Sequence, residues 1–123
     1  MAENFSHERI FENIAAVKDG IDFGCKASGR DVHDVTLLAA TKTVDPETVN
    51  FAIENGITTI GENRVQELLE KYDAINKDNV DIHFIGRLQT NKVKYIIDKV
   101  SMIHSVDSLK LAAEIDRQAK KHG

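Results

Sequence analysis

Residues 35–61, VTLLAATKTVDPETVNFAIENGITTIG, predict a strand, a helix and a second strand in direct succession. The first seven residues, Val35–Thr41, form the kind of apolar run that is typical of a buried strand. The DPE sequence at 45–47 then supplies a helix N-cap, a proline at the first helical position and an acid in the first turn. Asparagine and glycine at 55–56 end that helix, and ITTIG at 57–61 forms a second strand. Strands joined by a helix in this way are expected to run parallel.

The same alternation continues on both sides of this segment. Further strands are predicted at 82–86 and 102–106, and each is followed by an amphipathic stretch that predicts a helix. A longer helix is predicted before residue 35, with Ser6 as its N-cap. Short apolar strands that alternate with amphipathic helices predict a parallel sheet covered by helices. The predicted fold class is therefore α/β, with an N-terminal helix followed by four βα units.

Two architectures fit four such units: an open doubly wound sheet and part of a (β/α)8 barrel. The TKTVDP sequence at the end of the first strand contains no glycine, which disfavours a dinucleotide-binding sheet with its glycine-rich phosphate loop. Polar residues follow the predicted strands instead, and barrel enzymes carry their active sites at those strand ends. These polar residues are Lys42, Glu62, Asn63, Arg87, Ser105 and Asp107.

The length of the chain limits how much of a barrel it can form. A complete (β/α)8 barrel takes roughly 200 to 250 residues, whereas this chain has 123. We therefore expect a single partial domain, with the N-terminal helix and its connection at 1–34 and a half barrel at 35–123. A half barrel leaves the edges of its first and fourth strands unpaired, and unpaired edges favour self-association.

Composition narrows the class of protein further. The chain has a net charge of −4, 41% hydrophobic residues and 29% charged residues, as expected for a soluble globular domain. Its scattered lysines and arginines argue against nucleic-acid binding, and no apolar run approaches the roughly 20 residues of a membrane span. The single cysteine, Cys25, and an N-terminus unlike a secretory signal favour the cytoplasm. The absence of a Cys-x-x-Cys motif and of closely spaced histidines disfavours a metal site.

Lys42 has the most distinctive chemistry of the strand-end residues. Side chains alternate along a strand, so Ala40 and Lys42 lie on one face. If that face lines a barrel, Ala40 leaves space beside the lysine stem, and a lysine partly removed from water offers a nucleophilic amine. Such an amine forms a Schiff base with an aldehyde such as pyridoxal phosphate. The alternative is a surface lysine whose amine simply reaches solvent, and spacing alone leaves both interpretations open.

Several other polar positions admit two interpretations each. His83 and His104 either line a pocket or are buried histidines with satisfied hydrogen bonds. Asn63 caps the following helix, together with Gln66, or points its amide into the strand-end cleft, and these two roles are compatible. The RLQTNK sequence at 87–92 either holds an anion at a helix N-terminus or is a solvated loop.

Four segments in register resemble one known family: LLAATKTV, GENRVQELLEKY, IHFIGRLQTNKVK and IHSVDSLKLAAEI. Together they resemble the pyridoxal phosphate homeostasis proteins, the YggS/PROSC-like group that shares its fold with the N-terminal domain of alanine racemase. The resemblance runs from the first helix to the end of the chain. It implies a TIM-type (β/α)8 barrel that binds pyridoxal phosphate as a Schiff base. The implied role is in vitamin B6 homeostasis, without established catalytic turnover.

The resemblance also implies which residues bind the cofactor. Lys42 in ATKTV matches the family's Schiff-base lysine, and Asn63 in GEN and His83 in IHFIG match polar positions at the cofactor mouth. Ser105 in HSVD is a further match. The family continues through four more βα units, which include the segments that hold the cofactor phosphate, so this chain is expected to be the N-terminal half only. The alternatives are a racemase-like pyridoxal phosphate enzyme and an inert truncated fragment that cannot retain the cofactor.

Overall fold

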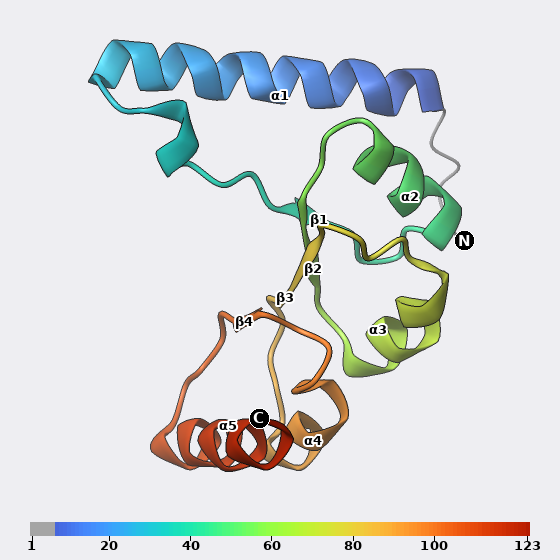
Figure 1. Cartoon of the computed structure of the whole chain (residues 1–123), viewed down its shortest axis with the longest axis vertical. Helices are drawn as coiled ribbons and strands as arrows, with labels where there is room; N and C mark the ends of the chain where they lie inside the picture. Colours follow the sequence, from blue (N-terminus) through green and yellow to red (C-terminus); the bar gives the residue numbers. More distant parts are fainter. Residues whose placement is uncertain (1–6) are drawn as a thin grey trace.

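The structure is a computed structural model that describes residues 7–123. Ser6, the expected cap of the first helix, lies outside the described residues. The elements follow the predicted order of one helix and four βα units (Figure 1). They are α1 (His7–Ser28), β1 (Ala39–Ala40), α2 (Pro46–Glu54), β2 (Thr59–Glu62), α3 (Val65–Lys71), β3 (Asp81–Phe84), α4 (Val93–Ile96), β4 (Met102–Ile103) and α5 (Leu109–His122), with the 3-10 helices η1 (Val32–Asp34), η2 (Tyr72–Ala74) and η3 (Thr90–Lys92).

The four strands are parallel and lie in the order β1-β2-β3-β4. One row of neighbours across the sheet consists of Ala40, Gly61, His83 and Met102. A barrel adds each strand beside the one before it, whereas a doubly wound sheet reverses its strand order at a switch point. The observed order confirms the α/β fold class and is that of a partial barrel.

The edge strands are shorter than predicted. β1 pairs only over Ala39–Ala40 instead of 35–41, and β4 only over Met102–Ile103 instead of 102–106. An apolar run predicts an extended segment, but a strand also needs a hydrogen-bonded neighbour, and β2 begins only at Thr59. An edge strand has such a neighbour on one side only, so its pairing ends where that neighbour ends.

Of the predicted helix caps, that of Asp45 is confirmed and that of Asn63 is wrong. The side chains of Asp45 and Ser108 cap α2 and α5, each accepting a hydrogen bond from the amide three residues ahead, at 3.0 and 3.1 Å. Asn63 does not cap α3, because Arg64 occupies the N-cap position and makes no side-chain cap hydrogen bond. β2 continues to Glu62, so the chain is only leaving the strand at Asn63.

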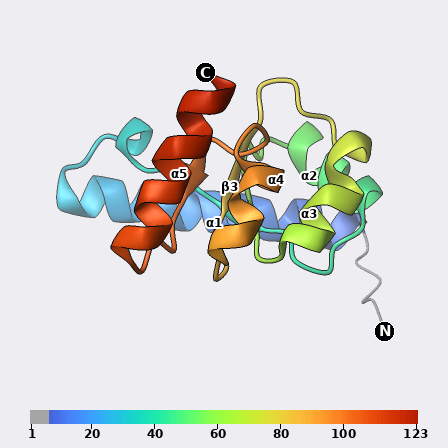
Figure 2. The ribbon, with the colours of Figure 1, turned by 90° about the horizontal axis from the view of Figure 1, so that it is seen from below.

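The hydrophobic core lies between the sheet and the helices that cover its outer face. Ile60, Ile82 and Phe84 contribute to it from the strands and are at most 4% exposed. The opposite face is open, and Ala40 and Met102 are exposed there. Figure 2 shows α3, α4 and α5 from below, with α1 lying behind them. The remaining buried core residues are Val49, Ile57, Leu68, Ile75, Leu88, Val93, Ile96 and Leu111.

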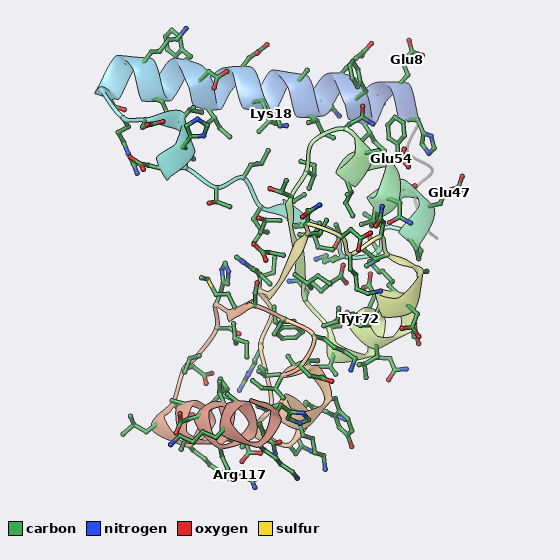
Figure 3. All side chains as sticks on the ribbon, in the orientation of Figure 1. Glu8, Lys18, Glu47, Glu54, Tyr72 and Arg117 are labelled. Atoms are coloured by element: carbon green, nitrogen blue, oxygen red, sulfur yellow. The ribbon has the colours of Figure 1, made fainter. Side chains whose placement is uncertain are left out.

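α1 is attached to the half barrel through α2 and the turn that follows it. Lys18 on α1 donates a hydrogen bond of 3.1 Å to the carbonyl of Gly56 (Figure 3). His7 stacks on Phe51 of α2, with ring centroids 4.1 Å apart. The far end of α1 extends beyond α2, and Phe23 is 76% exposed there. Within residues 7–123, no helix is long and apolar enough to cross a membrane.

Candidate functional site

Lys42 lies two residues after the end of β1, in a tight turn at residues 41–44. The amide of Val44 donates a hydrogen bond of 3.1 Å to the carbonyl of Thr41, which closes this turn. The Lys42 side chain is exposed, and among residues 7–123 no hydrogen bond or ion pair engages its amine. The partial burial expected for this lysine is not observed, because the face of the sheet that carries Ala40 is open. The amine is therefore accessible to a reagent.

Asn63 and Ser105 lie at the same edge of the sheet as Lys42, because parallel strands all end there. Gly86, which follows β3, lies against the backbone carbonyl of Asn63, and a Cβ at residue 86 would overlap that oxygen. The hydroxyl of Ser105 donates a hydrogen bond to the carbonyl of Gly86. The chain segments that leave β2, β3 and β4 are thus in contact with one another, and they bring these two predicted site residues together.

His83 lies on the open face of the sheet, in the row that also contains Ala40 and Gly61. Its Nδ1 atom lies 2.9 Å from Nε2 of His104, and the ring centroids are 5.0 Å apart. A hydrogen bond at this distance requires one ring nitrogen to donate and the other to accept. His83 is only half-buried and His104 is exposed, so neither is the fully buried histidine of the alternative interpretation.

Gly61 lies on the open face of the sheet, between two apolar side chains. A Cβ built on Gly61 would lie 2.6 Å from Cδ2 of Leu38 and 2.9 Å from Cδ1 of Ile85. The side chains of Leu38, just before β1, and Ile85, just after β3, therefore approach the glycine closely. Gly61 was not among the predicted site residues, although a glycine inside a predicted strand signals a close approach of this kind.

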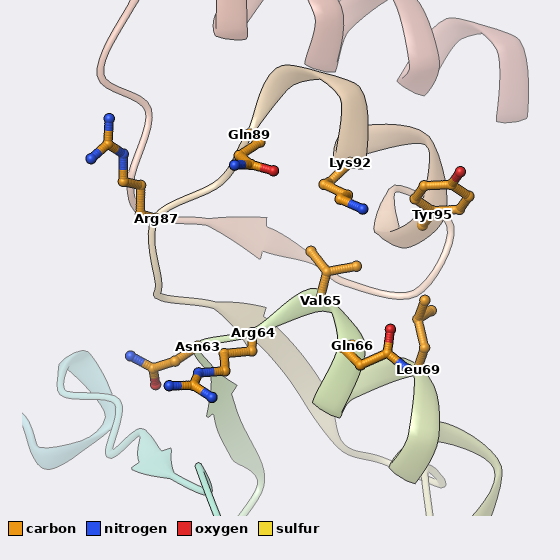
Figure 4. Close-up of a pocket in the computed structure, with 9 residues that line it drawn as sticks. All are labelled: Asn63, Arg64, Val65, Gln66, Leu69, Arg87, Gln89, Lys92 and Tyr95. Carbon is orange, nitrogen blue, oxygen red and sulfur yellow. The ribbon is translucent and has the colours of Figure 1, made fainter.

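A cleft of about 830 Å³ adjoins the ends of β2 and β3 (Figure 4). Arg64, Arg87 and Lys92 bring three positive charges to it, and no carboxylate is among its lining residues. The sequence left open whether 87–92 holds an anion or is a solvated loop, and it did not indicate the contribution of Arg64. The predicted helix N-terminus is not the feature found there, because the η3 turn precedes α4, which has only four residues. The other lining residues are Asn63, Val65, Gln66, Leu69, Gln89 and Tyr95.

The part of the chain that the structure describes contains no group of three or more metal-ligating side chains. At the strand ends it has an accessible nucleophile, the Lys42 amine, and other polar side chains lie at the same edge of the sheet. A parallel half barrel with this arrangement defines the class of protein, a βα-barrel protein with an accessible lysine at its strand ends.

The chain is similar in sequence to pyridoxal phosphate homeostasis proteins along about 90% of its own length. It is 46% identical over 111 residues to the pyridoxal phosphate homeostasis protein of Aquifex aeolicus, a match that covers 90% of this chain and 49% of the relative. It is 33% identical over 112 residues to that of Escherichia coli K12, covering 89% and 48%. The chain thus spans about half the length of the curated relatives it matches. No family model matches it.

Two solved structures are similar in both fold and sequence. A protein of unknown function from Bifidobacterium adolescentis superposes with a TM-score of 0.88 and 33% identity, covering 99% of this chain and 55% of that one. PipY of Synechococcus elongatus PCC7942, solved with pyridoxal phosphate bound, superposes with a TM-score of 0.74 and 29% identity, covering 93% and 50%. The resemblance predicted from the four sequence segments is confirmed.

Proposed function

We propose that this chain binds pyridoxal 5'-phosphate and takes part in the intracellular homeostasis of that cofactor, with Lys42 as its Schiff-base residue. The observation that carries the proposal is the exposed Lys42 amine at the strand ends, in a fold shared with PipY, whose structure contains bound pyridoxal phosphate. The cofactor supplies an aldehyde, which condenses with a free amine and releases one water. An amine held in an ion pair or beneath other side chains would be out of reach of the aldehyde.

The residues around Lys42 fit an anionic ring compound. Asn63 and Ser105 lie at the same edge of the sheet and His83 on its open face, and we assign these three to the lining of the cofactor mouth. Arg64 and Arg87 bring positive charge to that edge from the adjoining cleft. Positive potential at the mouth of a site attracts an anionic ligand such as a phosphate ester.

The role that we propose is binding without catalytic turnover, in the cytoplasm. The names of the relatives, which describe homeostasis and not catalysis, support this role. We assign it to a single partial domain in which the helix and connection at 1–34 precede the half barrel at 35–123. The alternatives are a racemase-like enzyme and a fragment that does not retain the cofactor.

Titration of the 123-residue chain with pyridoxal phosphate tests the proposal. We expect a saturable visible absorbance from the Schiff base, lost in Lys42→Ala and retained in Lys121→Ala, which removes an exposed lysine of α5. No saturable absorbance in the parent would favour the inert fragment, and an equal response of both variants would remove Lys42 from the site. Interconversion of added L-alanine and D-alanine would favour the racemase-like enzyme.

A further inference from the structure

The turn that carries Lys42 has an unusual backbone. Its closing hydrogen bond joins Val44 to Thr41, which places Lys42 and Thr43 at the two corner positions. Thr43 has a φ of 62°, in the left-handed region that β-branched residues rarely adopt. Turns with a positive φ at the second corner normally carry glycine or asparagine there. Contacts from outside the turn must therefore hold Thr43 in this conformation.

Three charged residues form an ion cluster beside this turn: Glu62 at the end of β2 and Glu67 and Lys71 on α3. The Lys71 ammonium lies 3.0 Å from Oε2 of Glu62 and 2.7 Å from Oε2 of Glu67. Glu62 is fully buried, Lys71 is 6% exposed and the side chain of Glu67 is 19% exposed. Charges removed from water in this way need well-placed partners, so the geometry of the cluster is tightly constrained.

The ion cluster holds the residue before Lys42. The Lys71 ammonium donates a hydrogen bond of 2.6 Å to the backbone carbonyl of Thr41. The hydroxyl of Thr41 donates a hydrogen bond to Oε2 of Glu62. Thr41 is itself 4% exposed, so both contacts lie in the protein interior.

The ion cluster also holds the residue after Lys42. The backbone N–H of Thr43 donates a hydrogen bond of 2.6 Å to Oε2 of Glu67. This oxygen is the one that pairs with Lys71, so a single carboxylate connects the strained residue to the buried ammonium. Lys42 thus lies between two residues whose backbone groups the ion cluster holds, and within the described residues its own amine makes no hydrogen bond or ion pair.

We propose that Glu67 and Lys71 are positioning residues for the Lys42 amine. Hydrogen bonds from α3 to both neighbours fix the backbone of Lys42 and so limit the directions in which its side chain extends. An ion cluster that served only core stability would have no need to bond backbone groups on both sides of this lysine. The inference rests on the proposed function, because it assigns the two residues to the lysine that we propose to bind the cofactor.

Variants at Glu67 test this role without leaving a buried charge unpaired, because Glu62 and Lys71 still pair with each other. Glu67→Met removes the acceptor for the Thr43 amide, whereas Glu67→Gln keeps an acceptor oxygen. Glu67→Asp keeps the charge but withdraws the carboxylate by one methylene. Glu70→Met is the matched control, since Glu70 is an exposed residue of α3 that accepts a hydrogen bond from Gln66.

Two readouts are needed, one with the cofactor and one without. The first is the share of Lys42 among all lysines labelled by pyridoxal phosphate and borohydride, measured by mass spectrometry on protein that circular dichroism shows to be folded. The second is the hydrogen-exchange rate of the Thr43 amide, measured by NMR in the absence of cofactor. Chemistry that depends on a held geometry is sensitive to shifts of about 1 Å.

We expect Glu67→Met to lower the Lys42 share about tenfold and to speed exchange at Thr43, with Glu67→Gln and the Glu70→Met control close to the parent. If Glu67→Met does not fold, a reduced Lys42 share in Glu67→Asp supports the proposal and an unchanged share overturns it. Folded Glu67→Met with the parental Lys42 share and Thr43 exchange rate also overturns it. If the parent itself shows no preference for Lys42, the proposed function fails, and the exchange rate still reports whether Glu67 holds the turn.

Discussion

Gly86 lies against the backbone carbonyl of Asn63, so closely that any side chain at residue 86 would overlap that oxygen. This contact joins the segments that leave β2 and β3 at the edge where the candidate site lies. Gly86→Ala should therefore force these segments apart and lower the free energy of unfolding by about 1–3 kcal/mol, as overpacking of a tight contact does. Urea unfolding followed by circular dichroism measures the change.

A glycine with open space around it provides the control for Gly86. Gly24 lies inside α1, and a Cβ built on it would meet no atom within 4 Å. Gly24→Ala should therefore stabilise α1 by roughly 0.5–1 kcal/mol, because alanine is the better helix former. A Gly86→Ala protein as stable as the parent would show that residue 86 does not need to be glycine.

The buried pair of Glu62 and Lys71 makes a second prediction about stability. Lys71→Met should lower the free energy of unfolding by about 3–5 kcal/mol, because it leaves the Glu62 carboxylate buried without its main partner. The double variant Glu62→Leu with Lys71→Met should recover much of that loss, since no buried charge remains. Lys120→Met breaks the exposed pair with Asp116 and should cost only about 0–1 kcal/mol. An equal loss of unfolding free energy in Lys71→Met and Lys120→Met would contradict the assignment of Glu62 and Lys71 as a buried pair.

The carboxylate of Glu114 on α5 makes the stability of this helix sensitive to acid. Hydrogen bonds from Arg117 at 2.8 Å and Gln118 at 2.9 Å hold the pKa of Glu114 at about 2, below its ordinary value of 4.5. A folded-state pKa below the unfolded value means that the contribution is complete above pH 4.5 and is lost as the pH falls towards about 2. The thermal midpoint of the parent should exceed that of Glu114→Gln near neutral pH, with the difference vanishing in strong acid. A difference that does not change with pH would contradict this.

β1 and β4 each pair with one strand only within the described residues, so each presents an unpaired edge. We expect the isolated chain to self-associate through these edges, because their free N–H and C=O groups favour pairing with another chain. Size-exclusion chromatography with light scattering should give a mass above the 13.7 kDa of one chain. A stable monomer over a wide range of concentrations would contradict the prediction.

The arrangement of the elements was predictable because it depends on local sequence. The cap at Asp45, the apolar strand before Lys42 and the spacing of the later strands each reflect near neighbours in the chain. Strand lengths were overestimated because they depend on where the neighbouring strand begins. Lys42, Asn63 and Ser105 were predicted as candidate residues, and the parallel order of the sheet brings them to one edge.

The contacts that hold the turn at 41–44 could not be predicted from local patterns. Lys71 reaches the carbonyl of Thr41 across 30 residues of sequence, and its partner Glu62 lies nine residues away on a different element. On α3 alone, Glu67 and Lys71 look like an ordinary surface pair at i and i+4. Their burial depends on how α3 packs on the sheet. That packing cannot be predicted from composition or periodicity.

Mapping the lysine that pyridoxal phosphate labels is the most direct test of the cofactor site. The 123-residue chain is mixed with pyridoxal phosphate, reduced with borohydride, digested and analysed by mass spectrometry to locate the modified residue. Lys42 should carry most of the label at a low ratio of cofactor to protein, and acid-denatured chain refolded before labelling should give the same result. Label spread over the lysines of α1, α4 and α5 with Lys42 unmodified would contradict the assignment of Lys42 as the cofactor-binding residue.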